Sequence, residues 1–74
     1  MITTERVVHS DPDIMSGTPV FVGTRVPVKT LIDYLEIGEP LGVFLDHFPG
    51  VSREQAVAAL KLANTWLVDH ARAA

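Results

Sequence analysis

Residues 51–70, VSREQAVAALKLANTWLVDH, give the clearest structural signal in the chain. Ser52 can cap the first turn of a helix, and Gln55, three residues later, can return the hydrogen bond in a capping box. Val51 and Ala56 would form the hydrophobic staple around this cap. Apolar residues then recur at helical spacing without a breaker, so the stretch predicts one long helix ending near its last residue.

Two shorter helices are predicted upstream of this one. Apolar residues fall on one helical face from Val28 until Gly38, a natural C-terminal stop. A second helix would begin near Pro40 and end at Pro49-Gly50. Gly42 lies inside it and costs about 1 kcal/mol relative to alanine, so this helix is expected to be weak.

The first third of the chain is rich in turn residues and predicts a small β unit. Two short valine-rich runs, Val7-Val8 and Val20 to Val22, are bracketed by turn signals and are expected to be strands. Asp11 and Asp13 flank Pro12, which is ordinary turn chemistry. A two-stranded unit is barely stable alone, so it must pack on the helices or on a second copy of the chain.

These elements predict a mainly α fold: a short two-stranded β unit followed by a three-helical, helix-turn-helix-like bundle. We expect a single domain over residues 1–74, with a strand and turn segment over 1–27 and the bundle over 28–74. A chain this short builds only one small core.

Composition favours a homodimer in the cytoplasm. The 74 residues include no cysteine to staple the fold, yet 47% of them are apolar, more than a monomer easily hides. No signal peptide is evident, and no stretch approaches the roughly 20 apolar residues that cross a bilayer. The net charge of -3 disfavours a non-specific nucleic-acid binder, because such proteins pair Lys and Arg with phosphates.

No arrangement of reactive side chains indicates an enzyme or a metal protein. The three histidines, His9, His47 and His70, fall in separate predicted elements without the spacing of a metal site. No nucleophile and base occur at a useful spacing, and neither phosphate-loop glycine pattern is present. We therefore expect no catalytic residue, no metal and no cofactor.

The predicted helix-turn-helix unit offers a candidate DNA-binding face. A groove would be read by the early residues of the last helix that we expect to be exposed, namely Arg53, Glu54, Ala58 and Lys61. They would need help from Arg25, Lys29 or a partner protein. These cations are either phosphate contacts or simply solvated charges. Arg25 has a second interpretation, which we favour: an ion pair with an acid such as Asp33.

Trp66 is the strongest candidate for a protein interface. It lies on the line of Leu62, beside the main apolar stripe, so the last helix is apolar around much of its circumference. A tryptophan on a second apolar face is a typical anchor for a partner chain. The alternative is that Trp66 closes the intramolecular core. The strand residues Val20, Phe21 and Val22 are further candidates for the partner or dimer interface.

Several motifs together resemble a known family. They are Asp11-Pro12, the block G-x-P-x-x-x-G-T-R-x-P-V over Gly17 to Val28, Gly38, and Phe48-Pro49 before the last helix. On these motifs the chain is similar to the domain-of-unknown-function family 433. The resemblance implies a strand unit followed by a helix-turn-helix-like bundle, often encoded beside a nuclease-like toxin related to PIN domains, and hence an antitoxin that dimerises and occludes its toxin.

The functional expectation is therefore an antitoxin that binds and inhibits a PIN-like nuclease, with autoregulation by binding operator DNA as a secondary activity. Its acidic middle segment, residues 28–50, suits a protein that covers a basic RNA-binding groove. The alternative is a free-standing helix-turn-helix transcriptional regulator without a toxin partner. Neither hypothesis involves a membrane or a small-molecule substrate.

Overall fold

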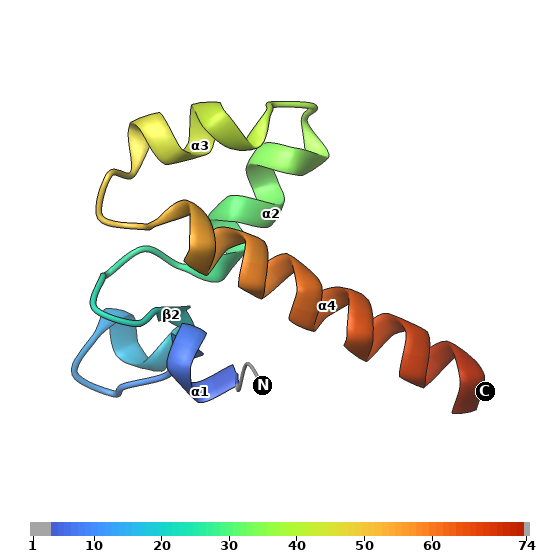
Figure 1. Cartoon of the computed structure of the whole chain (residues 1–74). Coiled ribbons are helices and arrows are strands. Elements are labelled where there is room, and N and C mark those ends of the chain that lie inside the picture. The colour runs from blue at the N-terminus through green and yellow to red at the C-terminus, as the bar shows by residue number, and fades with distance from the viewer. Residues whose placement is uncertain (1–3, 74) are drawn as a thin grey trace.

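The computed structural model describes residues 4–73, in which two short strands are followed by two short helices and one long helix (Figure 1). The helices are α2 (Val28–Glu36), α3 (Leu41–His47) and α4 (Arg53–Ala73). Strands β1 (Val8–His9) and β2 (Val20–Phe21) pair antiparallel. The predicted mainly α architecture is confirmed.

The cap that begins α4 forms as the sequence predicts. The backbone N–H of Gln55 donates to Ser52 Oγ at 3.0 Å, and the backbone N–H of Ser52 donates to Gln55 Oε1 at 3.1 Å. The staple residues Val51 and Ala56 are both buried. These contacts satisfy N–H groups that the first helical turn leaves without partners, so α4 starts at a fixed point.

The N-terminal segment contains more helix than its sequence indicates. A single helical turn, α1 (Thr4–Val7), precedes β1, so Val7 ends a helix instead of opening the strand. Between the strands, η1 (Met15–Gly17) is a tight turn in which all three residues have positive φ. Asp11 forms the expected turn, accepting the backbone N–H of Asp13 on its side chain at 2.9 Å.

The block Gly23-Thr24-Arg25 makes a closed turn between β2 and α2. Gly23 has φ +81°, which glycine adopts without strain. The Thr24 hydroxyl donates to the carbonyl oxygen of Phe21 at 2.9 Å and accepts the backbone N–H of Val26 at 3.0 Å. Arg25 is thereby left exposed beside the turn.

The core lies where the strand segment, α2, α3 and the first half of α4 meet. Phe21, Leu31 and Phe44 are fully buried, and Phe44 packs against the rings of Tyr34 and Phe48 at centroid distances of 5.6 and 5.1 Å. The small residues Ala56, Ala58 and Ala59 let α4 approach this cluster closely. The first half of α4 therefore passes between the α2–α3 pair and the strand segment (Figure 1).

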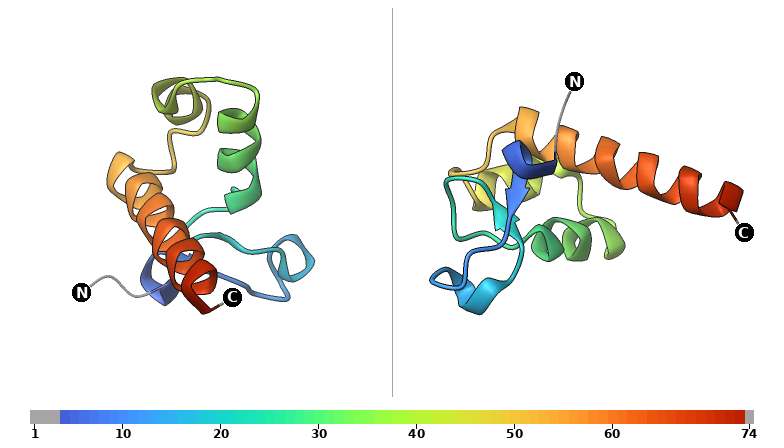
Figure 2. Two further views of the ribbon diagram at one scale, coloured as in Figure 1. Left: turned by 90° about the vertical axis from the view of Figure 1, so that its right-hand side faces the viewer. Right: turned by 90° about the horizontal axis from the view of Figure 1, so that it is seen from below.

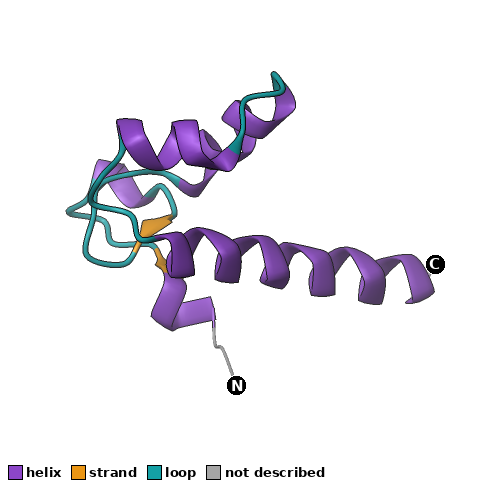
Figure 3. Cartoon of the chain, turned by 45° about the horizontal axis from the view of Figure 1, so that its top comes forward, coloured by secondary structure: helices purple, strands orange, loops and turns teal. Residues whose placement is uncertain are grey.

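The second half of α4 extends beyond the compact part of the chain, which consists of the strands, α2, α3 and the first half of α4 and which we call the body. We call residues 63–73 the distal half of α4. Figure 3 shows this part of the helix extending past every other element, and the view from below in Figure 2 shows the same. Every side chain from Ala63 to Arg72 is exposed.

Candidate interaction surfaces

The distal half of α4 carries large apolar side chains that the chain does not cover. Trp66 is 58% exposed, Leu67 is 61% exposed and Val68 is 40% exposed. The alternative in which Trp66 closes the intramolecular core is therefore wrong: by this point the helix has passed the body, and there is no core for Trp66 to close. Exposed apolar side chains such as Trp66 and Leu67 on a projecting helix are typical of a surface that contacts another molecule, whereas Val68 lies on the opposite side of the helix from Trp66.

Trp66 is held in place by a neighbour on its own helix. Its indole stacks on the imidazole of His70, with ring centroids 3.7 Å apart and planes inclined by 21°. His70 Nδ1 lies 2.8 Å from the carbonyl oxygen of Trp66, which fixes the orientation of the imidazole. The pair forms a flat, ordered aromatic surface one helical turn long.

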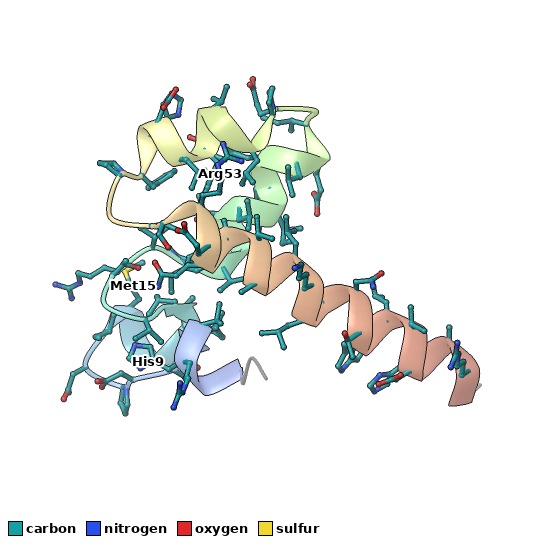
Figure 4. The ribbon with its side chains drawn as sticks, in the orientation of Figure 1. His9, Met15 and Arg53 are labelled. Atoms are coloured by element: carbon teal, nitrogen blue, oxygen red, sulfur yellow. The ribbon has the colours of Figure 1, made fainter. Side chains whose placement is uncertain are left out.

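The candidate DNA-binding residues of α4 gather around a shallow hollow. Arg53, Glu54 and Lys61 line a hollow of about 340 Å³ together with Val57 and Ala58. All three charged side chains are exposed, whereas Ala58, which the sequence predicted to be exposed beside them, is buried. Figure 4 shows Arg53 near the start of α4, on the side away from His9 and Met15.

The turn that carries Arg25 is a neighbour of the start of α4. A methyl group at Gly50 would lie 3.7 Å from Thr24 Cγ2, so the turn before α2 meets the turn before α4. The structure thus brings the turn with Arg25, a further candidate residue, close to the start of α4.

The expected ion pair between Arg25 and Asp33 does not form. Asp33 instead pairs with Lys29, one helical turn earlier in α2, with 2.9 Å between Nζ and Oδ1. Helical geometry explains the difference, because residues four apart on a helix face each other. The hydrogen bond and the charge of Asp33 raise the pKa of Lys29.

The strand residues do not offer the interface that the sequence suggested. Val20 and Phe21 are fully buried within the chain itself, so in this fold they have no surface for a partner. The β unit packs on the helices of its own chain and not on a second copy, and these were the two surfaces that could stabilise a marginal hairpin. Val22 and Leu62 are each partly exposed.

The histidines remain in separate places. His47 Nδ1 lies 2.7 Å from the Tyr34 hydroxyl and joins α3 to α2, whereas His70 belongs to the distal half of α4. His9, in β1, has a buried Nε2 without a hydrogen-bond partner (Figure 4). Within residues 4–73, no three His, Cys, Asp or Glu side chains come together as metal ligands.

Comparison with known families gives a match over most of the chain. The family model described as "Protein of unknown function (DUF433)" matches residues 8–63. The chain belongs to the DUF433 family. The match ends at the first residue of the distal half of α4, so the exposed Trp66 lies beyond the part that the family model describes.

A solved DUF433 structure shares the fold. The crystal structure of a DUF433 member from Anabaena variabilis ATCC 29413 superposes with a TM-score of 0.68 at 28% sequence identity, covering 95% of this chain and 71% of that chain. The uncharacterized protein y4eO of Sinorhizobium fredii (strain NBRC 101917 / NGR234) is 39% identical over 49 residues. Those residues are 66% of this chain and 22% of that protein, so the chain spans about a fifth of that relative's length.

Of the helices formed by residues 4–73, none has both the length and the apolar character that a bilayer crossing requires.

Proposed function

We propose that this DUF433 chain is an antitoxin-type protein that dimerises and inhibits a PIN-like nuclease by covering its RNA-binding groove. The observation that carries the dimerisation in this proposal is the distal half of α4, where Trp66 and Leu67 are more than half exposed on a helix that has left the body. Apolar side chains displayed this way contribute to association and cost solubility when left uncovered.

Charge supports a basic partner for the α2–α3 surface. Glu36 at the end of α2 and Asp46 in α3 are exposed. The cation of this segment, Lys29, is already paired with Asp33. An exposed acidic surface is complementary to the groove of a nuclease that holds RNA phosphates, and such complementarity speeds and orients association.

Co-expression with the product of the neighbouring gene, assayed as an RNA nuclease, tests this proposal. We expect the two proteins to co-purify and the nuclease to be inactive in the complex. Glu36→Lys should weaken the complex by about tenfold, with a steeper loss at high salt. Asp13→Lys, which makes the same charge change at an exposed turn, is the matched control and should have little effect. A nuclease that neither binds the wild-type chain nor loses activity would contradict the proposal.

A second candidate function is transcriptional regulation, favoured by the hollow that Arg53 and Lys61 line. In gel shifts on the upstream DNA, a groove-reading α4 predicts weaker binding for Arg53→Ala by about 1–3 kcal/mol. The acidic Glu54 on the same surface opposes binding to phosphates, and for that reason we rank this function second. Unchanged affinity in the variant would remove Arg53 from the model.

A further inference from the structure

The apolar stripe that packs α4 on the body continues onto the distal half. Ala56 and Ala59 face the core and are buried. Ala63, Trp66 and His70 follow them at alternating separations of four and three residues. Seven residues make about two helical turns, so Trp66 lies almost directly in line with Ala59. The exposed stripe is therefore a continuation of the buried face of α4, and not the second apolar face that the sequence suggested.

This alternating spacing is the one by which two helices pack side by side. Residues repeating every three and four positions form a seam along which side chains of one helix fit between those of another. The seam on the distal half consists of Ala63, Trp66 and His70. The large apolar Trp66 lies between the small Ala63, one turn before it, and His70, one turn after it. From this pattern we infer that the seam is covered by the same seam of a second copy of the chain, running antiparallel.

The position of the body excludes a parallel pair. The body lies on the seam side of the first half of α4, because Ala56 and Ala59 are buried against it. In a parallel pair, the bodies of both copies would lie at the same end. They would also lie on the sides of the two helices that face each other, so the bodies would collide. In an antiparallel pair each body lies beyond the tip of the other helix, and the projecting halves are free to pack along their length (Figure 3).

The antiparallel arrangement also determines which residues of the two copies contact each other. If the overlap is limited to the distal halves, the two-fold axis lies level with residue 68, and Trp66 of each copy packs on His70 of the other. Each Trp66 is already stacked on His70 of its own chain at 3.7 Å, so four aromatic rings would form the centre of the interface. Because this stack already forms within one chain, association does not have to create it.

The available area fits a weak but specific dimer. A tryptophan side chain buries up to about 250 Å², so the 58% that is exposed leaves roughly 140 Å² for a partner to cover. With Leu67 and the smaller residues of the seam, two copies would bury on the order of 1,000 Å² in total, the lower end for specific interfaces. We expect a dissociation constant on the order of 10 µM.

The dimer leaves the hollow at the start of α4 uncovered. Val57 in the hollow and Trp66 in the seam are nine residues apart. Nine residues make about two and a half helical turns, so the two residues lie on opposite sides of α4. The two hollows of the dimer would therefore face in opposite directions, and one straight duplex could not contact both. The α2–α3 surface stays free for the nuclease. The inference thus rests on the proposed function and assigns the distal half of α4 to a second copy.

Single cysteines introduced into the full chain test the antiparallel seam directly, because the natural sequence contains no cysteine. Leu67 lies beside the seam within one residue of the two-fold axis, so mild oxidation of Leu67→Cys should give a disulfide-linked dimer. Ala63→Cys should not cross-link, because its two copies would be about 15 Å apart along the helices. Val68→Cys lies on the outer side of α4 and is the second negative control.

Sedimentation of matched variants gives an independent readout. Trp66→Lys should weaken the dimer at least tenfold, whereas Val68→Lys, an equally drastic change on the outer face of the same helix, should weaken it less than twofold. Cross-linking of Ala63→Cys in place of Leu67→Cys would show a parallel pair and overturn the inference. So would equal effects of the two lysine variants, or a monomer at 100 µM. These measurements need no nuclease, so a failed dimer and a failed antitoxin are told apart.

Discussion

Gln55 Nε2 donates a 2.9 Å hydrogen bond to the carbonyl oxygen of Val22, 33 residues earlier in the chain. The same side chain accepts the backbone N–H of Ser52 through Oε1 and closes the cap of α4. One amide therefore fixes the start of the longest helix and ties that helix to the end of β2. The direction in which the distal half projects depends on this junction.

The two roles of Gln55 can be separated by substitution. Gln55→Ala removes both and should lower the free energy of unfolding by about 1–3 kcal/mol. Gln55→Glu keeps the acceptor for Ser52 but loses the donor to Val22. It should therefore retain the cap and lose the long-range hydrogen bond to Val22, which is the tie between α4 and the end of β2. Urea denaturation measures both variants against Glu54→Ala as a control. Wild-type stability in Gln55→Glu would show that the tie contributes nothing.

Phe44 is the side chain on which the core depends most. It is fully buried, with the Phe21 ring 6.2 Å away and the Phe48 ring 5.1 Å away. Phe44→Ala should cost about 3–5 kcal/mol, most of the stability of a domain this small, and leave the chain largely unfolded by circular dichroism. Ile37→Ala removes an apolar side chain that is 76% exposed and should change stability by less than about 0.5 kcal/mol. Similar losses in both variants would refute this assignment of the core.

Two glycines are expected to respond to alanine in opposite directions. Gly42 lies inside α3 with open space around its α-carbon, so Gly42→Ala should stabilise the protein by up to about 1 kcal/mol. Gly38 ends the α2 segment at φ +85°, where an L side chain is strained, so Gly38→Ala should destabilise it by about 1 kcal/mol. Thermal unfolding of both variants checks the pair, and a shift of the same sign in both would contradict the backbone geometry.

The ion pair in α2 gives a pH dependence at the alkaline end. Hydrogen bonding to Asp33 raises the pKa of Lys29 in the folded chain. Stability from a raised pKa is fully present below the unfolded value, near 10.4, and is lost as the pH rises through the folded value. The difference in stability between wild type and Asp33→Asn should therefore be constant from pH 7 to 9 and shrink above about pH 10. A difference that already shrinks between pH 7 and 9 would point to another group.

Elements with local causes could be predicted from the sequence. The cap of α4 depends on Ser52 and Gln55, three residues apart, and the end of the α2 segment depends on Gly38 alone. Turn chemistry at Asp11 was equally local. In each case the residues that fix the geometry are neighbours in the chain, so reading the sequence is enough.

The features that depend on distant contacts could not be predicted. The valine-rich strands had to pack on something, but only the fold shows that Val20 and Phe21 are buried by the chain's own helices. The tie between Gln55 and Val22 and the closeness of the turns at Thr24 and Gly50 have no sequence signal. The exposure of Trp66 follows from the length of α4 relative to the body, which no periodicity reveals.

The fluorescence of Trp66, the sole tryptophan of the chain, tests most directly whether the distal half of α4 is an interface. The emission maximum is followed as the protein concentration rises from about 0.1 to 100 µM, a range that brackets the expected dissociation constant. The antiparallel dimer predicts a shift to shorter wavelength as a second copy covers the indole. An emission maximum that remains at its solvent-exposed position over the whole range would contradict it.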